Sequence, residues 1–235
     1  AEIWVYLSAS PLTGLTLTLI AYLSAYWLYK RFEFNPLLNP VVIAVGLMVA
    51  VLWLTDTKYQ DYFEGAKFVH FLLGPATVAL AIPLYSQLPK LRAIWWQVSL
   101  SIVVGVSIAS LSAMWIAWML GASSETVLTL APKSVTAPVA MGIAEKSGGL
   151  PSLTAVLVVL TGVLGAVFGT KIFSLLRITD DTVRGIAIGV TSHGIGTARA
   201  FQVSERMGAF SGLAMALSAL ATALLLPWLI SLATS

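Results

Sequence analysis

The sequence contains no cysteine and very few charged residues. Without cysteine, the 235-residue chain can form no disulfide framework, thiolate nucleophile or cysteine metal site. Asp, Glu, Lys and Arg make up 10% of the residues, whereas soluble domains carry roughly 25%. Together with the 58% of hydrophobic residues, this composition excludes a disordered chain and a nucleic-acid-binding module. The net charge of +3 matters less than where the charges stand.

Long uncharged stretches predict a polytopic α-helical membrane protein. A spanning helix needs roughly 20 mostly apolar residues, and six stretches are long enough. The predicted spans lie near residues 8–29, 37–54, 66–87, 94–119, 150–172 and 209–232. Residues 3–29 lack a basic leading region and are too long for the apolar core of a signal peptide, so we expect no cleavable signal.

Two further apolar segments, 124–145 and 184–204, are interrupted. If both cross and the N-terminus lies outside, the inside loops hold six Lys/Arg and the outside loops five. If segment 124–145 instead enters and leaves on one side, the counts become seven and four. The positive-inside rule favours this re-entrant arrangement modestly. We therefore expect seven to eight membrane segments, two of them broken or re-entrant.

A weak internal repeat is consistent with the re-entrant arrangement. Asn-Pro-Leu-Leu-Asn-Pro (35–40) and Ala-Pro-Lys-Ser-Val-Thr-Ala-Pro (131–138) each place two prolines at a segment, and a G-x-x-T pattern occurs at 74–77 and 194–197. Such pairs indicate an inverted repeat, with 1–30 as an extra N-terminal helix, 35–120 as the first repeat and 121–235 as the second, all in one integral membrane domain 1–235. Chance is the open alternative, because Gly, Pro and Thr are common in membrane helices.

The stretch 131–138 is the first candidate site. Pro132 and Pro138 each remove a backbone donor, so the chain between them is expected to be unwound. Lys133 supplies a cation there, and Ser134 and Thr136 supply hydroxyl groups. A half-helix beginning near Pro138 would add its positive end, which makes an anion cradle. In the alternative interpretation, Lys133 reaches a lipid headgroup and the prolines only end a loop.

The stretch 191–199 is the second candidate. Gly194 and Gly196 permit a helix break or a close backbone approach. His193 can carry a proton near neutral pH, and Arg199 can clamp a carboxylate. Additional hydroxyl groups come from Ser192 and Thr197. The alternatives are a packing role for His193 and an interfacial or ion-pairing role for Arg199.

Asn39 and Thr77 are further candidate binding residues, for which capping is an equally good interpretation. Helix breaks are expected at Pro36, Pro40, Pro75, Pro132 and Pro138. No metal-ligand spacing, paired-carboxylate, G-x-S-x-G or P-loop pattern occurs, so we expect no enzyme activity, no cofactor and no metal site. The small residues at 208–216 would suit a homodimer contact or packing within one chain.

Several motifs together resemble the LrgB/CidB family of bacterial membrane proteins, whose relatives include plastid glycolate/glycerate translocators. They are NPLLNP (35–40), LLGPATVALAIPLY (72–85), LAPKSVTAPVAMGIAEKSGGLPSLTA (130–155), TGVLGAVFG (161–169), RGIAIGVTSHGIGTARAFQ (184–202) and GAFSGLAMAL (208–217). The resemblance implies either transport of small carboxylates of the pyruvate, glycolate or glycerate class, or control of murein hydrolase export and autolysis with a holin-like partner of the LrgA/CidA type. It also implies a bacterial inner membrane location and a fold similar to cation/proton antiporters and bile-acid symporters, which have inverted repeats.

We therefore expect a proton-coupled carboxylate transporter whose site forms where 131–138 approaches 191–199, near the bilayer midplane. Lys133 and Arg199 would neutralise the carboxylate, and His193 would carry the proton. The hydrogen-bonding groups would come from Ser134, Thr136, Ser192 and Thr197, with Gly194 and Gly196 allowing close approach. The expected partners are the substrate, the lipid bilayer, the holin-like protein and a second copy of the chain, and no nucleic acid.

Overall fold

The computed structural model describes residues 11–35, 38–72, 75, 79, 85 and 87–234, and these residues form helices and no strand. The chain divides into two compact units, residues 1–79 and 80–235. Four helices are long and apolar enough to cross a membrane: Leu12–Arg31, Trp95–Met119, Pro151–Leu175 and Glu205–Ser231. The protein is therefore a multi-pass helical membrane protein.

The helix positions follow most of the predicted spans. Helices α8 (Trp95–Met119) and α11 (Pro151–Leu175) agree with the spans at 94–119 and 150–172, and α13 (Glu205–Thr234) begins four residues before the span at 209–232. Helix α3 (Pro40–Leu54) is apolar but shorter than a full span. The span predicted at 66–87 differs, because α4 (Tyr59–Phe71) begins seven residues earlier and much of 73–86 lies outside the described residues.

In the first unit, α2 (Pro11–Arg31) packs on both α3 and α4. Gly14 allows α2 to approach the α4 backbone, because a Cβ there would lie 3.2 Å from the Cα of Gly65. The hydroxyl groups of Thr18 and Tyr62 hydrogen-bond across the same contact at 2.9 Å. A small residue and a polar pair thus join two helices, as is common between membrane helices.

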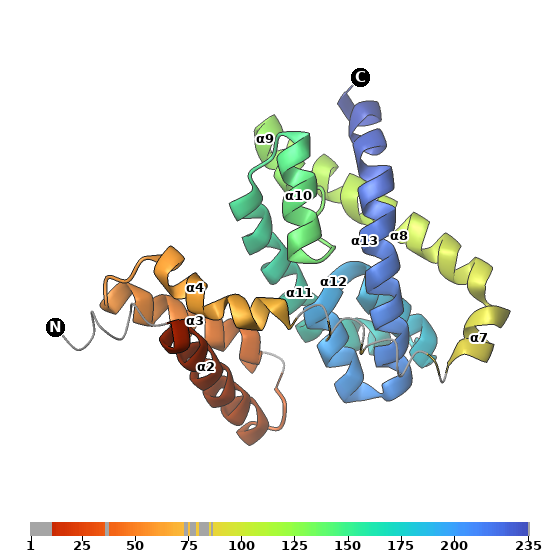
Figure 1. Cartoon of the computed structure of the whole chain (residues 1–235). Coiled ribbons are helices and arrows are strands. Elements are labelled where there is room, and N and C mark those ends of the chain that lie inside the picture. The colour runs from red at the N-terminus through yellow and green to blue at the C-terminus, as the bar shows by residue number, and fades with distance from the viewer. Residues whose placement is uncertain are drawn as a thin grey trace. The chain divides into compact units, whose positions relative to one another are not determined.

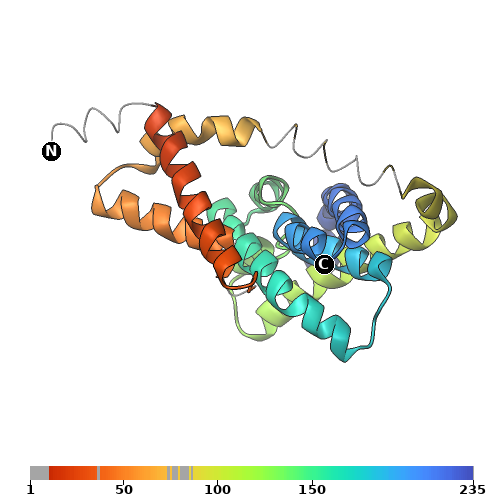
Figure 2. The same ribbon diagram turned by 90° about the horizontal axis from the view of Figure 1, so that it is seen from below.

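In the second unit, α13 runs alongside α12 (Asp181–Val203), and α8 packs on both (Figure 1; Figure 2). Val98, Ile102 and Val106 of α8 form a buried cluster with Val190 and Ala214. Along the chain, the short helix α7 (Leu88–Ala93) precedes α8. Helices α9 (Ser124–Leu130) and α10 (Ala137–Ser147) follow α8 in the sequence and precede α11.

The small residues of α13 are used within the chain. Gly189 of α12 lies so close to α13 that a Cβ would be 3.0 Å from the amide nitrogen of Met215 and 2.8 Å from the Cβ of Ala214. Ala209, Ser211 and Ala214 are at most 1% exposed. These three residues therefore pack inside one chain, and a homodimer contact through other residues of the run stays a prediction.

Candidate functional site

The segment 124–147 is broken where its prolines predict. Helix α9 has seven residues and α10 has eleven, so at about 1.5 Å per residue neither crosses a hydrocarbon core of roughly 30 Å. Between them the chain runs back along α10. Ala131 shares a cluster with Ile143 near the end of α10, whereas Val135 packs with Ala140 near its beginning.

The end of α9 lies beside the start of α11. Thr129 of α9 accepts a hydrogen bond from the Leu150 amide at 2.9 Å through its hydroxyl, and its carbonyl accepts one from the Thr154 hydroxyl at 3.0 Å. A Cβ on Gly149 would lie 2.9 Å from the Thr129 nitrogen, so only glycine fits there. The chain between Thr129 and Leu150 therefore doubles back. We call residues 124–147 hairpin 1, with its mouth at Thr129, beside the start of α11, and its tip near Val135.

Helix α12 also doubles back, at His193. A straight helix of 23 residues would separate its ends by about 34 Å. Instead, the hydroxyl of Ser204, which follows α12, donates to the carboxylate of Asp181 at its start, at 2.7 Å. Ile188 and Ala200, from the two arms, meet in one buried cluster. We call residues 181–203 hairpin 2; Figure 1 shows it as an arch.

The break in hairpin 2 falls on a residue that sequence reasoning did not choose. His193 has φ 40° and ψ −135°, a conformation that costs a non-glycine residue free energy. Of the expected glycines, Gly194 has nothing nearer to a Cβ than the sulfur of Met215 at 4.0 Å. Gly196 serves the close approach, because a Cβ there would lie 2.5 Å from the Cβ of Ser192.

Helix α11 receives both tips. The Nε2 of His193 lies 2.8 Å from the carbonyl oxygen of Val158, and the Val158 side chain packs against Val135 of hairpin 1. Since a carbonyl oxygen only accepts, the neutral imidazole donates through Nε2. A Cβ on Gly162 would lie 2.6 Å from His193 Cε1, and one on Gly165 would overlap Ser192. These two glycines form a seat for the tip of hairpin 2.

The hairpins approach α11 from opposite directions. The mouth of hairpin 1 lies beside Leu150, immediately before α11, and hairpin 2 begins at Asp181, shortly after α11 ends. Gly162, at the seat, lies one residue from the centre of the 25-residue helix. In Figure 1, α10 stands above the arch of α12. The two predicted breaks therefore converge beside the middle of a candidate membrane span.

The polar groups of hairpin 1 lie near its tip with few partners. Lys133 is half-buried, and its Nζ lies 3.4 Å from the hydroxyl oxygen of Ser134, which is 9% exposed. Within the described part of the chain, no carboxylate lies within 4 Å of Lys133. Thr136 is the N-cap of α10, but its side chain makes no capping hydrogen bond, and Pro138 follows in the first turn.

The polar groups of hairpin 2 are used differently. The Thr197 hydroxyl donates to the His193 carbonyl at 2.7 Å and lies 2.9 Å from the hydroxyl of Ser211 on α13. The hydroxyl of Ser192, which is 1% exposed, lies 3.0 Å from that of Thr191. The contact between Thr197 and Ser211 fixes the returning arm to α13.

Arg199 lies on the returning arm of hairpin 2, six residues beyond the break. Its Nη1 donates to Gln202 at 3.0 Å, and its Nε is buried without a partner among the described residues. Six helical residues correspond to about 9 Å, so Arg199 lies toward the mouth of hairpin 2. The structure does not bring it to the tip, where the sequence prediction placed it beside Lys133.

The remaining predicted residues lie in the first unit or outside the described residues. Asn39 is the N-cap of α3 and accepts a hydrogen bond from the Val41 amide at 2.9 Å, which is the capping role. Pro40 is the first residue of α3, so it begins a helix and does not break one. Pro75 is exposed. Pro36 and Thr77 lie outside the described residues.

Charged groups gather at the mouth of hairpin 2. Asp180 caps α12 by accepting hydrogen bonds from the amides of Thr182 and Val183, and Lys90 of α7 lies 3.7 Å from its carboxylate. Lys90 also donates to the Thr182 hydroxyl. Burial acts to raise the pKa of Asp180, but the hydrogen bonds and the Lys90 charge together lower it below its usual range. The contacts of Lys90 with Asp180 and Thr182 thus hold the mouth of hairpin 2 against α7.

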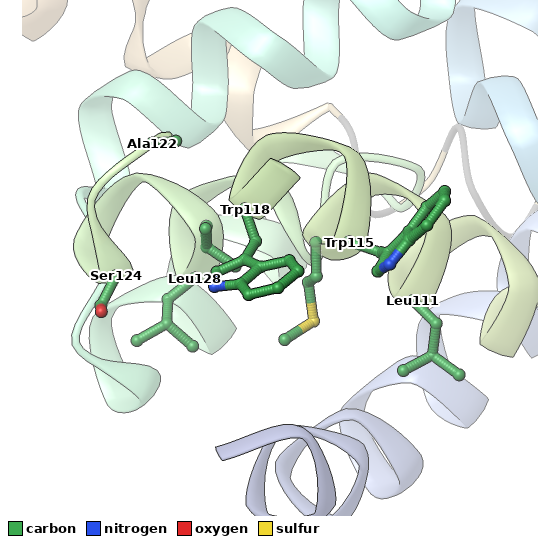
Figure 3. A pocket seen from close by; sticks show the side chains of 8 residues that line it. Leu111, Trp115, Trp118, Ala122, Ser124 and Leu128 are labelled. Atoms are coloured by element: carbon green, nitrogen blue, oxygen red, sulfur yellow. The ribbon is translucent and has the colours of Figure 1, made fainter. Parts of the chain in front are cut away.

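A separate cavity of about 760 Å³ lies between α8 and α9 (Figure 3). Its lining is aromatic and aliphatic with one hydroxyl, from Leu111, Met114, Trp115, Trp118, Ala122, Ser124, Val127 and Leu128. A cavity without a charged group does not suit a small anion, so the hairpin tips are the better candidate site.

The residues that sequence reasoning missed are Val158, Gly162 and Gly165. Val158 acts through its backbone carbonyl and its methyl groups, which no pattern marks. The available signal was the pair of glycines in the TGVLG stretch of an otherwise aliphatic span, because a glycine inside a membrane helix often marks a close approach.

Comparisons of the sequence with family profiles and with known proteins point to the same family. The LrgB-like family profile matches residues 18–232. The uncharacterized protein YwbG of Bacillus subtilis (strain 168) is 37% identical over 220 residues, which cover 94% of this chain and 97% of YwbG. Antiholin-like protein LrgB of Bacillus mycoides (strain KBAB4) is 31% identical over 219 residues, or 93% of this chain and 95% of that protein. No solved structure matches. The chain therefore belongs to the LrgB-like family.

Proposed function

We propose that this protein is a secondary transporter of small carboxylates, and that hairpins 1 and 2 are re-entrant segments whose tips form its substrate site. The observation that carries the proposal is the convergence of both tips on Val158, from opposite directions, inside a candidate membrane span. Broken backbone at membrane depth is tolerated only where it is buried in protein or lines a wet cavity. Opposed broken helices around a midplane site are typical of alternating-access transporters.

The groups at the tip of hairpin 1 suit one small anion. Lys133 has no carboxylate partner among the described residues, so its charge is available to a ligand. The hydroxyl of Thr136 is not used for capping, and the first amides of α10 point out of its N-terminus. A cation, a hydroxyl and a positive helix end together bind a carboxylate better than a neutral solute.

His193 is the proposed proton site. The residue is 5% exposed, and Nε2 donates to the Val158 carbonyl, so Nδ1 is the nitrogen that carries the lone pair. Protonation at Nδ1 would place a second positive charge at the tips when the anion binds. Release of the proton and the anion together would return the site to its empty state. One proton would then be transported with each carboxylate.

The topology that follows has seven to eight membrane segments in the bacterial inner membrane, with residues 35–120 and 121–235 as inverted repeats. Hairpins 1 and 2 supply the two broken segments of the second repeat. In the first repeat, the corresponding G-x-x-T stretch at 74–77 falls largely outside the described residues. A homodimer is proposed as the assembled form.

The test is uptake of radiolabelled pyruvate and glycolate into proteoliposomes under an imposed pH gradient. Lys133→Ala should reduce the rate at least tenfold while the protein elutes as a folded species. Lys146→Ala is the matched control, because Lys146 is exposed in the last turn of α10, and its uptake should equal wild type. Absence of uptake by folded wild-type protein, or equal uptake by the two variants, would contradict the proposal.

The second candidate function is control of a holin-like partner in autolysis, which the name "Antiholin-like protein LrgB" of several relatives favours. On this proposal the hairpins serve as hinges or partner contacts. The distinguishing result is a change in cell lysis caused by this protein and its LrgA/CidA-type partner, together with no carboxylate movement in proteoliposomes that contain both.

A further inference from the structure

Ser218 is a buried serine on α13 whose hydroxyl has no partner in the described part of the chain. Its side chain is 1% exposed, and its Oγ makes no hydrogen bond there. Helical hydroxyl groups in this protein usually donate to the carbonyl four residues earlier, as those of Thr18, Ser107 and Thr161 do. A buried polar group without a partner costs free energy, so its presence needs an explanation.

Ser218 lies on α13 between the positions that contact the two hairpin tips. One turn before it, the Met215 sulfur lies 4.0 Å from the hydroxyl of Thr197 in hairpin 2. The next residue, Ala219, packs against the cluster of Val135 and Val158, which joins the tip of hairpin 1 to α11. The hydroxyl therefore lies at the level where the tips meet, on a helix that passes both (Figure 1).

We infer that Ser218 is a substrate-binding residue contributed by α13, and that its hydroxyl donates a hydrogen bond to a carboxylate oxygen held by Lys133. This inference rests on the proposed function and adds α13 to the two hairpins as a wall of the site. The hydroxyl is then satisfied only when the anion is bound. A charge-assisted bond of this kind is strong because the site is shielded from water.

Ser211 provides a matched control on the same helix. It is also fully buried, at 0% exposure, but its hydroxyl already has a partner, the hydroxyl of Thr197 at 2.9 Å. Removal of Ser211 therefore breaks an existing hydrogen bond between α13 and hairpin 2, whereas removal of Ser218 breaks no hydrogen bond among the described residues. The two alanine variants should separate binding from stability.

The experiment measures glycolate and pyruvate binding to detergent-solubilised protein by calorimetry, their uptake by proteoliposomes, and thermal unfolding. Ser218→Ala should raise the dissociation constant and KM about tenfold, as expected for loss of a hydrogen bond to a charged group, with a melting temperature equal to wild type or higher. Ser211→Ala should lower the melting temperature and change KM less than twofold.

The outcomes distinguish the inference from the function on which it rests. If Lys133→Ala abolishes binding but Ser218→Ala binds like wild type, the role of Ser218 is overturned and the proposed function stands. A melting temperature lowered by Ser218→Ala as much as by Ser211→Ala, with unchanged affinity, also overturns it, because the hydroxyl is then structural. If the wild-type protein binds neither carboxylate, both proposals are overturned.

Discussion

Gly162→Ala should destabilise the protein, although the same change elsewhere in a helix should stabilise it. A Cβ at Gly162 would lie 2.6 Å from His193 Cε1, 2.8 Å from its Nε2 and 2.9 Å from the Cβ of Ile195. The ring would have to move, and its hydrogen bond to Val158 would be lost. Gly142 of α10 is the matched control, because no atom of the described residues would lie within 4 Å of a Cβ there.

The expected magnitudes have opposite signs. Replacement of a helical glycine by alanine contributes about 1 kcal/mol of helix propensity, and Gly142→Ala should gain about that much. At Gly162 the same gain is outweighed by overpacking of about 1–3 kcal/mol and by loss of a hydrogen bond of about 1 kcal/mol. The net loss is roughly 1–3 kcal/mol, and each kcal/mol corresponds to about 2–4 °C in a chain of this size.

Thermal unfolding in detergent micelles, followed by tryptophan fluorescence, measures both variants. Gly142→Ala should melt above wild type and Gly162→Ala below it. In a His193→Ala background, the penalty of Gly162→Ala should shrink, because the ring that it displaces is gone. If Gly162→Ala melts at or above Gly142→Ala, the tip of hairpin 2 does not rest on α11, and the reasoning is refuted.

Two further predictions concern the hairpin mouths. Thr129→Val should lower stability by about 1 kcal/mol, because it removes the hydroxyl that accepts the hydrogen bond of the Leu150 amide; an unchanged melting temperature would show that the mouth of hairpin 1 is open. The lowered pKa of Asp180 means that its carboxylate stabilises the fold above the unfolded pKa, near 3.9, and that this contribution is lost as the pH falls through the folded pKa. Melting temperatures of Asp180→Asn should accordingly vary less than those of wild type between neutral pH and pH values below about 4, and identical pH profiles would contradict the capping role.

The helical membrane class and the longest spans could be predicted from sequence, because hydropathy and length decide them. The prediction at 94–119 differs from α8 by one residue, because a long uncharged run contains that helix. The break in hairpin 1 was also predictable, because Pro132 and Pro138 each remove a backbone donor and disfavour a helical conformation in the residue before them.

The contacts that define the site depend on tertiary packing, so they could not be predicted from the sequence. Glycines were the expected break in hairpin 2, yet the chain bends at His193, because the bond to Val158 and the seat at Gly162 hold that residue in a glycine-like conformation. The count of seven to eight segments stays a prediction, since only four helices meet the length and apolarity of a span within the described residues. Ser218 was not among the predicted site residues, because nothing in the apolar sequence around it distinguishes it from the other hydroxyl residues of α13.

The most direct test of the central claim is whether α12 doubles back. The chain has no cysteine, so Asp181→Cys with Ser204→Cys adds the only two thiols. The two native side chains are 2.7 Å apart, so oxidation or a short dimaleimide should join the cysteines within one chain, detected as a linked peptide by mass spectrometry. Ser152→Cys with Leu175→Cys, at the same sequence separation on straight α11, should give no link, because about 34 Å separates them. Equal absence of a link in both pairs would contradict hairpin 2 and the site built on its tip.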